Sequence, residues 1–166
     1  SKWCGAGGWR LGTFSFPPEL HWLLEAIAGV ASETFTSTSA PIQYAAITAF
    51  RGGIQIERYL AHSRRILKML GAWCSERLAR TGAHLVRPKG AFYLFPDFTP
   101  LKDRLYKNGI TTSAQLADRA LKEAKVAILP GVSFGRNPSE LTVRLAYVNF
   151  DGSSALAASE LVPLHE

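Results

Sequence analysis

The sequence contains few of the residues that build disulfide-rich, metal-binding or membrane-spanning proteins. Its 166 residues include only two cysteines, Cys4 and Cys74, too few for a disulfide framework or a cysteine metal cluster. No run reaches the roughly 18 uninterrupted apolar residues of a membrane span. Four histidines lack the spacing of metal ligands: His21, His62, His84 and His165. These absences favour a cytoplasmic protein with no metal site and no membrane contact.

The beginning of the chain lacks an initiator methionine, a charged leader and a hydrophobic signal core. The opening Ser1-Lys2 therefore predicts a piece of a longer polypeptide. With 47% hydrophobic residues, the chain can still bury a core of one or two compact units.

Acidic residues are also few, because 13 of them face 19 lysines and arginines, for a net charge of +6. The basic residues are spread along the chain among acids, and aromatic residues are not interleaved with them as base-stacking platforms. We therefore expect no nucleic-acid partner. A nucleic-acid-binding module is the alternative, and it predicts an affinity that falls steeply as salt rises.

Lys2 opens a glycine-rich segment, residues 2–12, that also contains Arg10. A lysine among small and apolar neighbours loses its proton more readily than one in water, and a neutral amine is what carbonyl chemistry needs. The guanidinium of an arginine offers a fixed fork suited to phosphate. A phosphorylated aldehyde would use both groups. The open alternative is a solvated terminal lysine followed by a loop.

Residues 2–12 resemble the cofactor-lysine signature of class I and II pyridoxal-phosphate aminotransferases: a lysine, two variable residues, a small one, and then Gly-x-Arg-aliphatic-Gly. The resemblance implies that the cofactor is pyridoxal 5′-phosphate. It implies that Lys2 forms the internal Schiff base and then moves a proton between the substrate α-carbon and the C4′ atom of the cofactor. It also implies that Arg10 holds the cofactor phosphate.

Hydrophobic periodicity predicts the elements that follow this segment. We expect a short strand at residues 13–16, a helix at 19–31, a loop at 32–39 and a helix at 41–50 that stops at two glycines. A long amphipathic helix is expected at 54–81. The expected buried side of the helix at 19–31 consists of Leu20, Leu23, Leu24, Ile27 and Val30. That of the long helix consists of Ile56, Leu60, Leu67, Leu70 and Cys74.

In the remainder of the chain, helical and strand patterns alternate with hairpin-type connections. This mixture predicts an α+β unit with helices packed on a mostly antiparallel sheet. Strands are expected at residues 83–86, 91–95, 126–129 and 141–148. A capping box at Thr112 predicts a helix that ends near Ala124, and a last helix is expected at 153–161.

Arg144 lies within an expected strand of apolar and small residues. Because an unpaired buried guanidinium is costly, it should face an anion. By resemblance to the arginine of a similar Val-Arg-Leu strand in the aminotransferases, Arg144 would bind the α-carboxylate of the substrate. The alternative is a structural salt bridge to Glu140, Asp151 or Glu160.

Two further segments lie between Arg10 and Arg144 in the order that the family shows. They are Pro88-x-Gly-Ala-Phe-Tyr-x-Phe-Pro96 and Leu129-Pro-Gly-x-x-Phe-Gly135. Packing alone also explains their glycines and aromatics, so a direct role beside the substrate stays open. Ser37, Ser39 and Tyr44 lie where related enzymes bring the neighbouring subunit toward the cofactor, although a polar loop and a helix cap are the simpler interpretation.

The resemblance implies the carboxy-terminal part of a fold-type I enzyme, with α/β and α+β portions. Residues 1–53 would be the end of the large cofactor domain, 54–81 a connecting helix and 82–166 the small domain. The parent protein would be a homodimer that transfers an amino group from an amino acid to a 2-oxo acid. The isolated chain would be inactive, because the aspartate that protonates the cofactor ring nitrogen is missing. The alternatives are an effector-sensing module of a transcription regulator and a lyase or synthase of the same fold.

Overall fold

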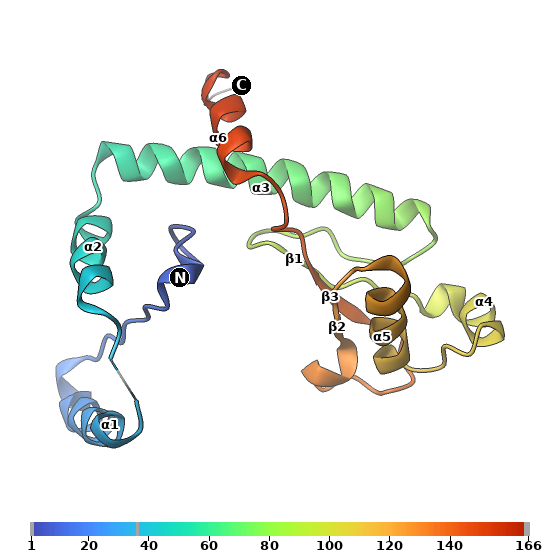
Figure 1. Cartoon of the computed structure of the whole chain (residues 1–166), viewed down its shortest axis with the longest axis horizontal. Coiled ribbons are helices and arrows are strands. Elements are labelled where there is room, and N and C mark those ends of the chain that lie inside the picture. The colour runs from blue at the N-terminus through green and yellow to red at the C-terminus, as the bar shows by residue number, and fades with distance from the viewer. Residues whose placement is uncertain (1, 36, 165–166) are drawn as a thin grey trace. The chain divides into compact units, whose positions relative to one another are not determined.

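The structure is a computed structural model that describes residues 2–35 and 37–164 (Figure 1). The chain divides into two compact units, Ser1–Leu60 and Ala61–Glu166. The boundary falls inside the longest helix, α3 (Ile54–Arg80).

The first unit is helical. It contains two short 3-10 helices, η1 (Gly7–Trp9) and η2 (Pro18–Leu20), and then α1 (His21–Thr34), α2 (Ala40–Arg51) and the start of α3. The expected helices at residues 19–31 and 41–50 are therefore confirmed. Gly52 ends α2 with a φ of 69°, in the left-handed region that glycine enters without a steric penalty.

Two expectations for this unit are wrong. Residues 13–16 form no strand, because an extended segment becomes a strand only when a neighbour pairs with its backbone, and no described residue does so. The apolar side of α1 is not buried: no residue of α1 is buried, and Val30 is 65% exposed. The expected loop at 32–39 begins only after Thr34, and Thr36 lies outside the described residues.

The second unit combines helices with a small sheet. After α3 come β1 (Tyr93–Leu94), η3 (Thr99–Leu101), α4 (Lys102–Lys107), α5 (Ser113–Ala124), β2 (Leu129–Pro130), η4 (Gly131–Phe134), β3 (Val143–Ala146) and α6 (Gly152–Glu160). The strand order is β1-β3-β2, and both pairings are antiparallel. Helix α5 packs against β2 and η4 (Figure 1). The expectation of helices on an antiparallel sheet is confirmed.

The core of this unit lies along the central strand. Leu94, Leu141 and Val143 are almost completely buried. Helix α6 is joined to α3 by a buried hydrogen bond of 2.9 Å between His62 Nδ1 and Ser159 Oγ. The long helix follows its expected bounds, but of its five expected buried positions only Leu60 is fully buried.

The strands are shorter than their hydrophobic runs predicted. Residues 83–86 contribute only a single bridge, between His84 and Asp97, and the strand expected at 91–95 is reduced to Tyr93–Leu94. The strand expected at 126–129 is instead Leu129–Pro130. Helix α4 was not expected. Among the described helices, none is both long enough and apolar enough to cross a membrane.

Candidate functional site

The segment that carries Lys2 and Arg10 is held against α2 and the start of α3. The Trp3 ring stacks on Phe50 of α2 with centroids 5.6 Å apart and an interplanar angle of 12°. Gly5 has a φ of 67°, and a Cβ atom there would lie 2.6 Å from the Tyr59 hydroxyl. A side chain at residue 5 would therefore displace the segment, which explains why this residue is a glycine.

Arg10 stands at a sharp bend, since its backbone is left-handed with a φ of 54°. Its carbonyl oxygen accepts a hydrogen bond of 3.3 Å from the Thr38 hydroxyl, and its guanidinium donates one of 3.4 Å to the Gly7 carbonyl. The bend thus joins the glycine-rich segment to the residues that precede α2.

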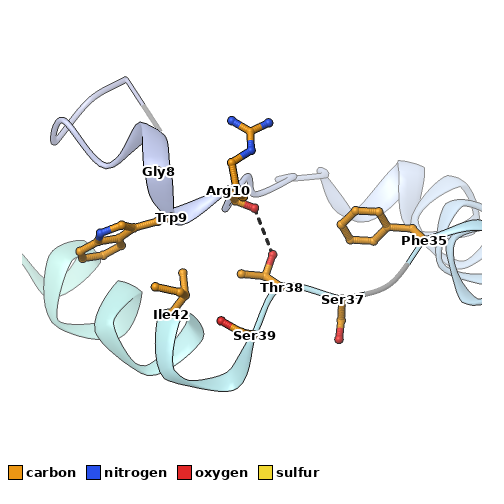
Figure 2. A pocket seen from close by; sticks show the side chains of 8 residues that line it. All are labelled: Gly8, Trp9, Arg10, Phe35, Ser37, Thr38, Ser39 and Ile42. Carbon is orange, nitrogen blue, oxygen red and sulfur yellow. Dashed lines mark hydrogen bonds between the residues drawn. The ribbon is translucent and has the colours of Figure 1, made fainter.

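A cavity of about 450 Å³ lies at this junction (Figure 2). Its lining consists of Gly8, Trp9, Arg10, Phe35, Ser37, Thr38, Ser39 and Ile42. Its polar side-chain groups are the Trp9 indole, the Arg10 guanidinium and the hydroxyls of residues 37–39, all of which can donate hydrogen bonds. None is a carboxylate. Such a lining suits an anion. In Figure 2 the guanidinium of Arg10 points away from Ser37 and Ser39, so the three groups share the cavity without converging on one point.

The positions singled out beside the cofactor are therefore divided. Ser37 and Ser39 line the cavity with Arg10, and Ser39 precedes α2 without a side-chain hydrogen bond to the helix. Tyr44 is 73% exposed and is not part of the lining. Lys2 is exposed and does not line this cavity either. Lys2 and Arg10 therefore do not meet at this cavity.

Arg144, in the second unit, lies on the central strand β3 and is half-buried. Its guanidinium carbon lies 4.5 Å from the centroid of the Tyr93 ring and 4.6 Å from that of the Phe134 ring. These are cation–π distances. Tyr93 and Phe134 come from the two segments between Arg10 and Arg144 that resemble family motifs, so the fold brings three sequence signals together.

Two of the three acids proposed as salt-bridge partners of Arg144, Glu140 and Asp151, are engaged elsewhere. Glu140 pairs with Arg136 at 2.6 Å, and Asp151 accepts hydrogen bonds from Ser154 at the start of α6. Between residues 2 and 164, apart from Thr36, Arg144 forms no ion pair. The structural salt bridge with these residues is absent.

The two aromatic segments are tied closely to β3. Gly131 donates a backbone hydrogen bond of 2.8 Å to the Thr142 carbonyl, and a Cβ atom at Gly131 would lie 1.9 Å from the Thr142 hydroxyl. Tyr147 donates from its hydroxyl to the Ala91 carbonyl at 3.1 Å. Burial, and then the nearby Cys74, raise the pKa of Tyr147, so its phenol keeps the donated proton. Close packing against Thr142 is thus the reason that residue 131 is a glycine.

Sequence reasoning singled out Arg144 as a candidate but did not predict its contacts with the Tyr93 and Phe134 rings. It treated residues 90–95 and 130–135 as possible backbone contributors, whereas the structure shows that two of their side chains contact the guanidinium. The sequence held one signal for these contacts: both segments that resemble family motifs contain aromatic residues, Tyr93 and Phe134 among them. In the described part of the chain, no three His, Cys, Asp or Glu side chains gather as metal ligands.

Comparison with known proteins assigns the chain to a family. Residues 1–152 match the model of aminotransferases of class I and II. The chain is 35% identical over 150 residues to the aspartate aminotransferase of Pyrococcus abyssi, a match covering 89% of this chain and 34% of that protein. It is 34% identical over 152 residues to aromatic-amino-acid aminotransferase 2 of Thermococcus litoralis, with the same coverage of both.

A solved structure agrees with this assignment. The crystal structure of the aromatic aminotransferase from Pyrococcus horikoshii superposes with a TM-score of 0.68 at 30% identity, covering 93% of this chain and 37% of that one. The fold and the family match define a portion of a fold-type I transferase. The chain belongs to the class I and II aminotransferase family.

The chain spans about a third of the length of the relatives it matches. The expectation that this third is the carboxy-terminal part is not supported by the comparisons. The chain consists of helices with a small antiparallel sheet, and it matches a portion of a fold-type I aminotransferase.

Proposed function

We propose that the full-length protein containing this chain is a pyridoxal-phosphate-dependent aminotransferase that moves an amino group from an amino acid to a 2-oxo acid. The observation that carries the proposal is the family match over residues 1–152, which include Lys2, Arg10 and Arg144. Because the named relatives are aspartate and aromatic-amino-acid aminotransferases, aspartate, phenylalanine and tyrosine are the first amino donors to test.

The cavity beside Arg10 supports a phosphate role for that residue. Its polar lining consists of the Arg10 guanidinium and hydroxyls that can donate, and it contains no acidic side chain. A carboxylate there would repel a phosphate, whereas a guanidinium offers charge and two parallel donors. Arg10 would therefore hold the phosphate of the cofactor, which, when bound, supplies an electron sink for the bond that breaks at the substrate α-carbon.

Lys2 would provide the amine. Its Nζ would bind the cofactor aldehyde covalently in the resting protein. Once released by substrate, the same Nζ would take the proton from the substrate α-carbon and return a proton at the cofactor's C4′ atom. The amine must be neutral to bind the aldehyde and to take the proton, and as the ammonium that results it can return a proton. Lys2 is exposed in this chain.

Arg144 would bind and orient the substrate. Its guanidinium is half-buried, and it has no carboxylate partner among residues 2–35 and 37–164. A substrate α-carboxylate would supply that partner through two parallel hydrogen bonds. Binding there fixes the direction of the substrate, so that its α-hydrogen can be presented to the lysine.

The 166-residue chain alone is inactive, because it spans about a third of its relatives and no acid lines the Arg10 cavity that could protonate a cofactor ring nitrogen. The full-length protein forms a homodimer, as is usual in the family. It resides in the cytoplasm, where the free thiols of Cys4 and Cys74 suit a reducing environment.

Substitutions in the full-length protein test the assignment. Replacing Lys2 with alanine should abolish transamination, because no other amine takes over both tasks. Arg144→Ala should raise the KM for the amino acid about 10- to 150-fold, the value of a charged hydrogen-bonded pair of about 1.5–3 kcal/mol. Arg144→Lys keeps the charge but loses the two parallel donors of the guanidinium. Its KM should lie between those of the wild type and Arg144→Ala. Full activity in Lys2→Ala would contradict the proposal, and an unchanged KM in Arg144→Ala would remove the substrate role of that arginine.

A further inference from the structure

Arg144 is held between segments that adjoin its strand on both sides. In the sheet order β1-β3-β2, Arg144 lies on the central strand (Figure 1). Tyr93 belongs to β1 on one side, and Phe134 ends η4, which directly follows β2 on the other. Their ring centroids lie 4.5 and 4.6 Å from the guanidinium carbon. One cation thus meets one ring from each neighbouring segment.

The two rings are themselves fixed. Phe134 meets Phe95 edge to face, with centroids 5.8 Å apart and an interplanar angle of 83°. Tyr93 packs against Phe92 at 4.6 Å. Rings packed in this way lose their rotational freedom on folding rather than on ligand binding. A guanidinium resting on them is therefore ordered before a ligand arrives.

Aromatic partners differ from acidic ones in what they leave free. A ring face attracts a cation through its quadrupole but does not satisfy the strong N–H donors of a guanidinium. A structural carboxylate would occupy those donors and would compete with an incoming carboxylate. Since Glu140 and Asp151 are paired with Arg136 and Ser154, the cation is stabilised here while its fork stays available.

We propose that Tyr93 and Phe134 are positioning residues for amino-acid binding: they hold the Arg144 guanidinium in place for the α-carboxylate of the substrate. The inference rests on the proposed function, because the carboxylate it invokes is that of the transaminase substrate. It adds two residues that act through Arg144 and that need not touch the substrate. Removing either ring should loosen the guanidinium and weaken carboxylate binding, with little effect on the chemical step.

The experiment compares ring-removing and ring-keeping variants in the full-length protein loaded with cofactor. Tyr93→Leu and Phe134→Leu remove a ring but keep an apolar side chain, whereas Tyr93→Phe keeps the ring and removes the hydroxyl. Trp73→Leu is the matched control, because Trp73 forms a similar contact with Arg77, 4.8 Å from the ring centroid, on the surface of α3. Thermal melting verifies that each variant is folded.

Binding is measured by calorimetry with 2-methylaspartate and 2-methylphenylalanine, which have an α-carboxylate but no α-hydrogen to lose. We expect each leucine variant to bind the tighter probe about two- to fivefold more weakly, the size of one exposed cation–π contact. Tyr93→Phe and Trp73→Leu should bind as the wild type does. In steady-state assays, the leucine variants should raise KM by the same factor and leave kcat within about twofold.

Equal affinity in the wild type and both leucine variants would overturn the inference, as would a loss in Tyr93→Phe as large as that in Tyr93→Leu. If a leucine variant does not fold, Tyr93→Met or Phe134→Met, flexible side chains without a ring, take its place under the same criteria. A wild type that binds a probe but transfers no amino group refutes the proposed function alone. A wild type that binds neither probe overturns the inference as well.

Discussion

At the scale of single residues, Gly131 shows how tightly the arginine strand is packed. A Cβ atom at this position would meet the hydroxyl of Thr142 at 1.9 Å and its carbonyl oxygen at 2.9 Å. The carbonyl cannot retreat without losing the hydrogen bond from the Gly131 amide. Gly131→Ala should therefore lower the free energy of unfolding by about 1–3 kcal/mol, as overpacking does, measured by urea denaturation.

Gly152 provides the control for that measurement. It begins α6, and a Cβ atom there meets nothing within 4 Å. Gly152→Ala should leave the stability unchanged or raise it by up to about 1 kcal/mol, because alanine favours a helix. Equal stabilities of the two alanine variants would show that Gly131 is not packed as described.

Sequence reasoning at this scale relied on the conflict between burial and charge. A binding role was predicted for Arg144 because a guanidinium in an apolar strand needs a partner. The partner groups could not be identified from the sequence, because Tyr93 and Phe134 lie 51 and 10 residues away and only the sheet order brings them together. Charge alone suggested Glu140 and Asp151, which are used locally by Arg136 and Ser154.

At the scale of elements, short-range signals predicted helices well. The capping box at Thr112 forms as expected, with Gln115 donating its amide to the threonine hydroxyl and accepting from the Thr112 amide. Such caps are encoded within four residues. Strands were predicted poorly, because strand pairing depends on residues that are distant in the sequence. In the run at 83–86, only His84 forms a bridge, and its partner is Asp97.

The start of α6 gives an acid-sensitive cap. Asp151 accepts hydrogen bonds from the Ser154 hydroxyl at 2.6 Å and the Ser154 amide at 3.0 Å, and these bonds lower its pKa, the hydroxyl contributing most. Since the folded pKa lies below the unfolded value of about 3.9, the stabilisation is complete above about pH 4. It is lost as the pH falls through the folded pKa.

Ser154→Ala tests this cap. By removing the largest cause of the shift, it should weaken the decline of melting temperature on acidification below about pH 4. Ser153→Ala, which leaves both Ser154 bonds intact, should decline like the wild type. Thermal melts monitored by circular dichroism at several pH values make the comparison. A decline in Ser154→Ala as steep as in the wild type would show that the cap does not titrate.

At the scale of the whole molecule, the chain leaves much apolar surface open. Along and after α1, Trp22, Val30 and Phe35 are each more than 60% exposed. The periodicity of α1 predicted a buried apolar side, but the described residues bury no residue of α1. Patterning predicts which face seeks a partner, not whether this chain supplies it.

The proposed inactivity of the isolated chain is tested at this scale. The 166-residue chain, mixed with pyridoxal 5′-phosphate, aspartate or phenylalanine and a 2-oxo acid, should produce no more amino-group transfer than free cofactor does. The full-length protein under the same conditions should turn over. The measurement is a chromatographic assay of the new amino acid. Transfer by the isolated chain at the full-length rate would show that this third of the protein suffices.

The central claim, that this chain carries the cofactor amine of an aminotransferase, is tested most directly by covalent trapping. The full-length protein is reduced with borohydride, digested, and its peptides are identified by mass spectrometry. The claim predicts a phosphopyridoxyl group on the peptide containing Lys2 and on no other, and its loss in Lys2→Ala. Label on a different lysine, or cofactor that remains free after reduction, would contradict it.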